Sequence, residues 1–155
     1  MTIRERLGSL AGVRVAWVGD GTNVLVSLAW LASLVGMEVV AACPKGYEPP
    51  EGTPVELFPD PREAARDADV LVTDIWVSLG QEATRAERLR DLEPYRLDES
   101  LLALASPDAI VLHCLPAHPG EEISPEALYG PRSAVWDEAE NRLHTQKALL
   151  ALLLG

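Results

Sequence analysis

The sequence predicts an α/β fold: a doubly wound, Rossmann-like parallel sheet with strand order 3-2-1-4-5 and helices on both faces. Two observations support this prediction. Five short apolar runs alternate with segments that carry helix caps or apolar residues at helical spacing. The apolar runs are almost continuous, which is typical of strands buried on both faces of a parallel sheet. Right-handed crossovers then make one doubly wound sheet the simplest arrangement.

Length and composition indicate a single domain over residues 1–155. About two thirds of the unfolded surface can be buried at this length, and 48% of the residues are hydrophobic. The net charge of −11 argues against nucleic acid or a membrane surface as a partner. Cys43 and Cys114 lack metal-type spacing and are typical of free thiols in a reducing compartment. No signal peptide or membrane-spanning run is evident, so we expect a cytoplasmic protein.

The first two predicted strands are joined in the sequence by a predicted helix. Val13 to Val18 is the first strand, and it ends in the turn Gly19-Asp20-Gly21. Thr22 can cap the following helix, and Gly36 is placed to end it. Glu38 to Ala42 is then the second strand.

The middle of the chain begins with a loop. Prolines and glycines are dense over residues 44–54, which predicts irregular structure, and Val55 to Phe58 is the third strand. A short helix runs from Pro61 to Arg66, and Val70 to Thr73 is the fourth, buried strand.

The last third contains three further helices and one strand. Gln81 to Leu92 is a charged helix, and Asp98 caps a helix over Glu99 to Ala105. Ala109 to Leu112 is the fifth strand. The remaining elements are a short helix opened by Ser124, a brief extended piece over Ala134 to Trp136, and a final helix capped by Asp137 that covers residues 138–154.

Polar residues follow three of the predicted strands. They lie at residues 19–23, 74–78 and 113–115. Ligands of such sheets bind outside the carboxyl ends of the strands, near the point where the strand order reverses. The sequence therefore predicts one binding site at this edge.

The individual residues leave several interpretations open. Gly19-Asp20-Gly21 could contact a dinucleotide, but the third glycine of that motif is missing and no acidic residue ends the second strand. A tight turn, or backbone amides that face a small zwitterion together with Asn23, fits better. Asp74 could bind an amino group or cap a turn, because a buried carboxylate needs a cation or donors.

Cysteine, arginine and histidine residues also have ordinary interpretations. Cys114 could be a nucleophile, a thiol that contacts a ligand, or a buried small hydrophobe. Arg142 could pair with nearby glutamates on its own helix. His118 and His144 have no second ligand at metal spacing, so we interpret both as ordinary polar residues and predict no metal site.

Six sequence blocks resemble those of the ornithine carbamoyltransferase family, in the same order. They are Gly-Asp-Gly-Thr-Asn at 19–23, Pro-Lys-Gly-Tyr-Glu-Pro at 44–49, Thr-Asp-Ile-Trp-Val-Ser-Leu-Gly-Gln-Glu at 73–82, His-Cys-Leu-Pro-Ala-His at 113–118, Asp-Glu-Ala-Glu-Asn-Arg at 137–142 and Leu-His-Thr-Gln-Lys-Ala at 143–148. The resemblance covers the ornithine-binding half of that family. The half that binds carbamoyl phosphate, with its Ser-x-Arg-Thr-Arg motif, is absent, and residues 1–12 look like the remnant of an interdomain helix.

The resemblance implies a reaction and a set of residue roles. Such enzymes transfer a carbamoyl group from carbamoyl phosphate to L-ornithine, giving L-citrulline and phosphate in arginine biosynthesis, without metal or organic cofactor. Asp74 would bind the ornithine α-ammonium, while Asn23, Ser78 and the Leu79 amide would position its amino-acid end. Cys114 would lie beside the δ-amine, and the Leu115 carbonyl and Arg142 would contact the carbamoyl group.

Several positions depart from the family pattern. Thr22 replaces an expected Asn, Leu79 replaces the usual Met, and the linker over residues 50–54 is short. Val26 and Trp30 are apolar for a surface that faces the cleft, which suggests a packing or partner surface, either natural or redesigned. We therefore expect an ornithine-binding domain that is inactive alone. The alternative is a non-catalytic scaffold that self-associates through its exposed interdomain face.

Overall fold

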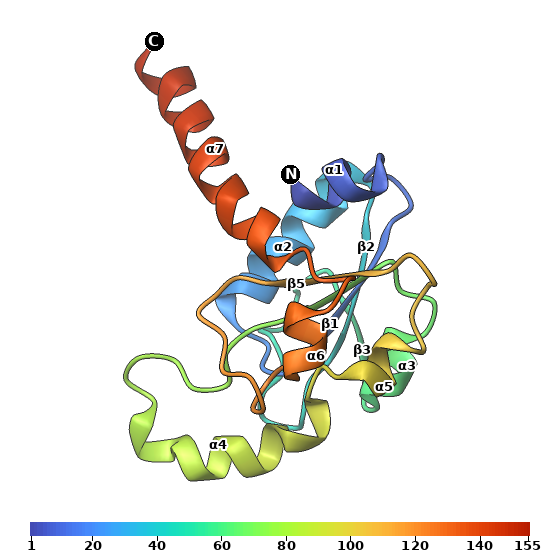
Figure 1. The fold of residues 1–155 in the computed structure, drawn as a ribbon. Helices are drawn as coiled ribbons and strands as arrows, with labels where there is room; N and C mark the ends of the chain where they lie inside the picture. Colours follow the sequence, from blue (N-terminus) through green and yellow to red (C-terminus); the bar gives the residue numbers. More distant parts are fainter.

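The computed structural model describes all 155 residues and contains one five-stranded parallel sheet (Figure 1). Its strand order is β3-β2-β1-β4-β5, so the predicted order is confirmed. All four strand pairs are parallel. The strands are β1 (Arg14–Val18), β2 (Glu38–Ala42), β3 (Glu56–Phe58), β4 (Val70–Thr73) and β5 (Ile110–His113).

Helices cover both faces of this sheet, as predicted. The α-helices are α1 (Thr2–Leu7), α2 (Asn23–Val35), α3 (Pro61–Ala65), α4 (Arg85–Leu92), α5 (Glu99–Leu102), α6 (Pro125–Tyr129) and α7 (Val135–Leu154). Two short 3-10 turns, η1 (Glu82–Thr84) and η2 (Glu93–Tyr95), flank α4. The helix predicted over residues 81–92 is therefore divided, and the one predicted over 99–105 ends early.

Alternate residues of the central strands enter two separate cores. Val15 and Trp17 face α1 and α2, whereas Ala16 and Val18 face α3, α5 and α6. This alternation follows from the two-residue period of a strand. Because both faces are covered, the four residues of β4 and of β5 are all buried.

Capping explains where α2 begins and ends. The Thr22 hydroxyl accepts a hydrogen bond from the Val24 amide, and Gly36 ends the helix in the left-handed region with φ 76°. Asp98 and Ser124 cap α5 and α6 in the same way. These four caps agree with the sequence prediction.

The start of α7 corrects two predictions. Residues 134–136 are not extended, and Asp137 is not the cap: Ala134 occupies the N-cap position, and α7 begins at Val135. Ser133 forms a parallel bridge with Val111, which places Val135 directly in the core. Asp137 lies within the first turn and instead pairs with Arg6 of α1.

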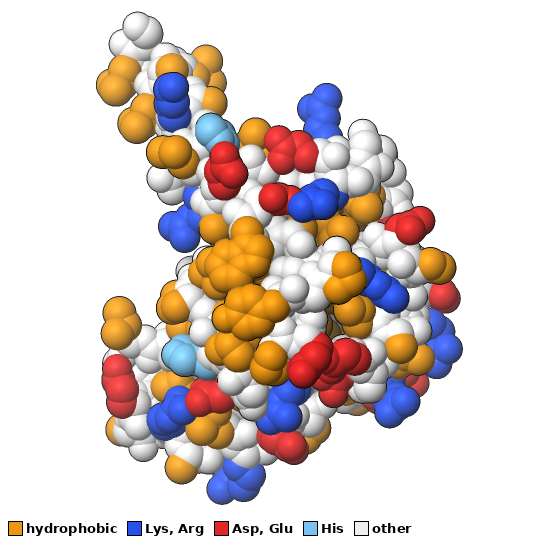
Figure 2. Space-filling view, in the orientation of Figure 1, with side chains coloured by type: hydrophobic (Ala, Val, Ile, Leu, Met, Phe, Trp, Pro, Cys, Tyr) orange, Lys and Arg blue, Asp and Glu red, His pale blue; other side chains and the backbone are white.

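The end of α7 projects away from the rest of the molecule (Figure 1). Its base is fastened to α1, since the Asn141 amide donates to the Thr2 hydroxyl at 2.9 Å and to the Glu5 carboxylate at 2.6 Å. Beyond Asn141 every residue is exposed, and hydrophobic side chains are visible along this end in Figure 2. The helices include none that combines the length and apolar character needed to cross a bilayer.

Candidate functional site

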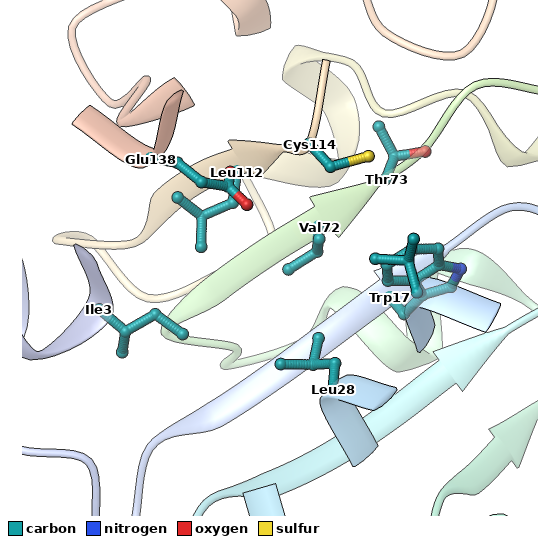
Figure 3. A pocket seen from close by; sticks show the side chains of 9 residues that line it. Ile3, Trp17, Leu28, Val72, Thr73, Leu112, Cys114 and Glu138 are labelled. Atoms are coloured by element: carbon teal, nitrogen blue, oxygen red, sulfur yellow. The ribbon is translucent and has the colours of Figure 1, made fainter. Parts of the chain in front are cut away.

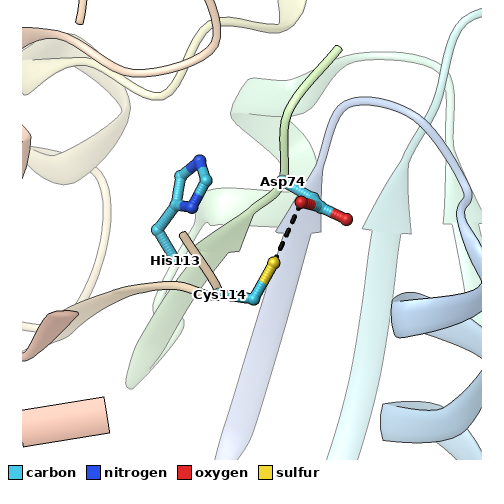
Figure 4. Close-up of side chains that lie close together, drawn as sticks. All are labelled: Asp74, His113 and Cys114. Atoms are coloured by element: carbon cyan, nitrogen blue, oxygen red, sulfur yellow. Dashed lines mark hydrogen bonds between the residues drawn. The ribbon is translucent and has the colours of Figure 1, made fainter. Parts of the chain in front are cut away.

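Strand register brings two polar residues together at the carboxyl edge of the sheet. Thr73 of β4 pairs with His113 of β5, so the next residues in each chain segment, Asp74 and Cys114, leave the sheet side by side. The Cys114 thiol donates a hydrogen bond to Asp74 Oδ1, with Sγ 2.9 Å from the oxygen (Figure 4). Asp74 is buried, at 8% exposure.

The other oxygen of Asp74 contacts the cap of α2. Thr22 Oγ1 donates to Asp74 Oδ2 at 3.2 Å, and the Ile75 amide donates to Oδ1 at 2.8 Å. Segments that follow β1, β4 and β5 therefore meet at one carboxylate. This arrangement places a negative charge at the mouth of the sheet with hydrogen-bond donors on several sides.

The environment of Cys114 keeps its sulfur protonated. Burial, together with the hydrogen bond and negative charge of Asp74, raises the pKa of the Cys114 thiol from 9.0 to about 12. A reactive cysteine needs the opposite effect, a lowered pKa that yields thiolate. At neutral pH Cys114 is thus a hydrogen-bonding thiol, which argues against the nucleophile interpretation.

Cys114 also borders a small cavity of about 90 Å³ (Figure 3). Seven of its nine lining residues are hydrophobic, among them Trp17, Leu28 and Leu112. Glu138 of α7 supplies the one charged lining group, and burial raises its pKa above the ordinary value. The Glu138 carboxylate accepts a hydrogen bond from the His113 amide at 2.9 Å, so α7 is anchored to the end of β5.

The glycine turn after β1 is explained by packing. A Cβ atom on Gly21 would lie 2.4 Å from the Pro49 nitrogen, and the Gly21 amide donates to the Tyr47 carbonyl at 2.7 Å. The turn is also paired with α4, because Asp20 forms a salt bridge with Arg88. This close approach accounts for Gly21 without a phosphate, which favours the tight-turn interpretation.

The remaining predicted site residues make no hydrogen bond to Asp74 or Cys114. Asn23 is exposed as the first residue of α2, and Ser78 is half-buried with its amide bonded to the Gln81 side chain at 2.9 Å. Leu79 is 98% exposed. Arg142 is exposed and lines a separate groove between α1 and α7.

Leu115 continues directly from Cys114. It is half-buried and adopts a positive φ of 56°, which is unusual for a branched residue. Its amide donates to His113 Nδ1 at 2.9 Å. The backbone turn that carries Leu115 is therefore fixed by the preceding histidine.

Three contributors to the site were not identified from the sequence. Thr22 contacts Asp74, Glu138 lines the cavity, and Glu122 lies beneath His113 with no exposed surface. Thr22 was recognised as a cap and as a replacement of the Asn expected in the family, but not as a contact of Asp74, and an acidic residue in the first turn of a helix is common without any site. Glu122 follows Glu121 in a polar segment, so its sequence context gave no signal of burial.

Two groups of potential metal ligands lie close together. The ligand atoms of Asp74, His113 and Cys114 are within 4.8 Å of one another, as are those of His118, Glu121 and Glu122. In the first group the Cys114 thiol donates a hydrogen bond to Asp74, and His113 Nδ1 accepts a hydrogen bond from the Leu115 amide. These donors are thus already engaged within the protein.

Comparison with known proteins identifies the family of this chain. The model of the family described as aspartate/ornithine carbamoyltransferase, Asp/Orn binding domain, matches residues 11–153. The chain belongs to this family. Ornithine carbamoyltransferase from Methanoculleus marisnigri is 55% identical across the whole chain, and that from Thermus thermophilus is 54% identical across 99% of it. The chain spans about half the length of these relatives, at 53% and 52%.

Solved structures of carbamoyltransferases share the fold. The Thermus thermophilus ornithine carbamoyltransferase superimposes with a TM-score of 0.91 at 49% identity, covering 99% of this chain and 52% of its own. A more distant match is a mutant N-acetyl-L-ornithine transcarbamylase, with a TM-score of 0.82 at 26% identity, covering 98% and 53%. The resemblance stated from the sequence blocks is confirmed at the level of family and fold.

The bond between Cys114 and Asp74 predicts how the thiol reacts. In Asp74→Asn the negative charge is lost while the burial remains, so the pKa of Cys114 falls below its value of about 12 and the thiolate fraction at pH 8 rises. We expect iodoacetamide to alkylate Cys114 about tenfold faster than in the parent protein, as a one-unit pKa change implies.

Mass spectrometry of timed samples measures this rate. Cys43→Ser in both proteins leaves Cys114 as the one reporting thiol. Equal alkylation rates with and without Asp74 would contradict the assigned hydrogen bond.

Proposed function

We propose that this chain is the ornithine-binding half of an ornithine carbamoyltransferase. The direct contact between Asp74 and Cys114 at the carboxyl edge of the sheet carries the proposal. A buried carboxylate attracts an amino group, and a neutral thiol can hydrogen-bond to a second amine. The names of the most similar relatives support L-ornithine, which has two amines, as the ligand.

In this proposal Asp74 binds the α-ammonium of ornithine. The carboxylate is buried and its nearest partners are neutral donors, so a cationic ligand supplies the charge that the protein leaves uncompensated. Asn23, Ser78 and the Leu79 amide position the amino-acid end. These three groups are wholly or partly exposed, which leaves them available to a ligand.

The carbamoyl transfer itself needs a second group of residues. Carbamoyl phosphate binds the half of the relatives that this chain does not span, and the Leu115 carbonyl and Arg142 contact its carbamoyl group. The δ-amine beside Cys114 attacks the carbonyl carbon, the C–N bond forms, the bond to phosphate breaks, and a proton leaves the nitrogen. Positioning the two reactants lowers the barrier, and the Arg142 guanidinium stabilises charge on the carbonyl oxygen.

Calorimetric titration with L-ornithine tests the binding role of Asp74. We expect saturable binding by the parent chain and a loss of affinity of at least about tenfold in Asp74→Asn, because a charge-assisted hydrogen bond is removed. Asp108→Asn is a matched control, since Asp108 is exposed and precedes β5 at the opposite edge of the sheet. Identical heats for Asp74→Asn and the parent would remove Asp74 from the site.

A steady-state citrulline assay tests the division of the reaction between two halves. The 155-residue chain alone, given ornithine and carbamoyl phosphate, is expected to form no citrulline above the uncatalysed rate. Activity should return when the carbamoyl-phosphate-binding half of a relative is added in excess. Turnover by the chain alone would refute this division.

A second candidate function is a self-associating scaffold, and the exposed apolar side chains favour it. Trp30 and Leu34 on α2 and a leucine-rich end of α7 are all more than half exposed. The leucines on α7 are Leu143, Leu149, Leu150, Leu152, Leu153 and Leu154. Exposed apolar surface of this kind favours association of copies.

Light scattering over a range of concentrations separates this candidate from a monomer. A scaffold predicts a dimer or larger species that Leu153→Lys shifts toward monomer, because a charge is placed in the apolar contact. Trp30→Lys tests in the same way whether α2 contributes to the contact between copies. Leu79→Lys, on an exposed loop, is the control and should leave the oligomeric state unchanged. A monomer at high concentration would argue against the scaffold.

A further inference from the structure

A buried histidine and glutamate lie beneath the proposed ornithine site. His113 is 1% exposed and Glu122 has no exposed surface. A ring nitrogen of His113 lies within 4.8 Å of a carboxylate oxygen of Asp74 and of the Cys114 sulfur, and in Figure 4 the thiol points to Asp74. Glu122 has no exposed surface, so it does not itself touch a ligand bound beside Cys114.

Hydrogen bonding determines which nitrogen of His113 carries the proton. The Leu115 backbone amide lies 2.9 Å from Nδ1, and an amide can only donate, so Nδ1 is the unprotonated acceptor. The hydrogen of the neutral ring is then on Nε2. Glu122 Oε1 lies 3.3 Å from Nε2, within ion-pair distance, and Nε2 has no hydrogen-bond partner, so the Glu122 charge is the group that faces it.

We propose that Glu122 is a positioning residue for the Cys114 site, acting through His113. The Glu122 carboxylate holds His113 in the Nε2–H tautomer, and the free Nδ1 then fixes the Leu115 amide and the turn that follows Cys114. The catalytic importance of Glu122 rests on the proposed function, in which the Leu115 carbonyl contacts the carbamoyl group.

The backbone conformation of Leu115 explains why the turn after Cys114 needs support from neighbouring residues. A branched residue at φ 56° does not hold this conformation by itself, so its surroundings must stabilise it. The His113 amide donates to Glu138, and the Glu122 carboxylate faces the Nε2 end of the ring at 3.3 Å. Glu122 is held in turn by the His118 amide, which donates to its Oε1. A chain of contacts thus extends from a buried acid through the His113 ring to the turn.

The first test reads the tautomer and the Leu115 amide directly, without any ligand. Long-range nitrogen NMR should show His113 as the Nε2–H form in the parent protein. In Glu122→Met the Nδ1–H form becomes populated, and hydrogen exchange of the Leu115 amide should accelerate about tenfold because its acceptor is lost. Glu126→Met makes the same change at an exposed position and should alter neither signal.

Two outcomes of this test overturn the proposal. One is a parent His113 that is Nδ1–H or doubly protonated. The other is unchanged Leu115 exchange in a folded Glu122→Met protein. Both readouts remain decisive if the parent chain does not bind ornithine, so failure of the proposed function is distinguishable from failure of this inference.

The second test is a rescue that a merely structural role would not show. Asparagine places a fixed oxygen acceptor near the position of Nδ1 and has no tautomers. His113→Asn should therefore bind ornithine within about threefold of the parent, whereas His113→Leu should bind at least about tenfold more weakly.

Combining the variants completes the rescue. Glu122→Met should weaken ornithine binding at least about fivefold in the parent but less than about twofold in the His113→Asn background. Equal losses in the two backgrounds would overturn the route through His113. If Glu122→Met does not fold, the contrast between His113→Asn and His113→Leu decides, and equal binding by those two variants overturns the proposal.

Discussion

The register between β4 and β5 is the constraint on which the site depends. Thr73 and His113 are paired across two adjacent parallel strands, so the residues that follow them are neighbours. Both strands are buried throughout, and a slip by one residue would turn their apolar side chains to the wrong core. The contact between Asp74 and Cys114 is therefore specified by burial of the strands, independently of any ligand.

This constraint explains why the sheet and the edge that carries the site could be predicted from the sequence. Continuous apolar runs show where strands lie, and caps such as Thr22 and Gly36 show where α2 begins and ends. The end of β5 was predicted one residue too early, at Leu112. One residue matters here because it assigns His113 to the strand, where its ring is buried beside Glu122.

Residues that enter the site from distant segments could not be predicted in this way. Glu122 and Glu138 are glutamates in polar surroundings, and sequence alone does not distinguish them from solvated charges. Glu138 reaches the site because residues 132–134 return across β5 and hydrogen-bond to Val111, whereas the Glu122 carbonyl accepts a hydrogen bond from the Leu97 amide of a distant segment. The start of α7 was misplaced for the same reason, because this long-range pairing, rather than a local cap, determines where the helix begins.

The proposed site consists of a fixed part and an open part. Asp74, Cys114, Thr22 and the turn at Leu115 are held by hydrogen bonds within the chain. Leu79 and Arg142 are exposed and have no such bonds in this structure. A fixed carboxylate and thiol can bind an amino acid with little loss of entropy, while exposed side chains become ordered only when something covers them. In the proposed function the fixed part binds ornithine, and the open part completes its contacts when the second substrate arrives with the other half of the enzyme.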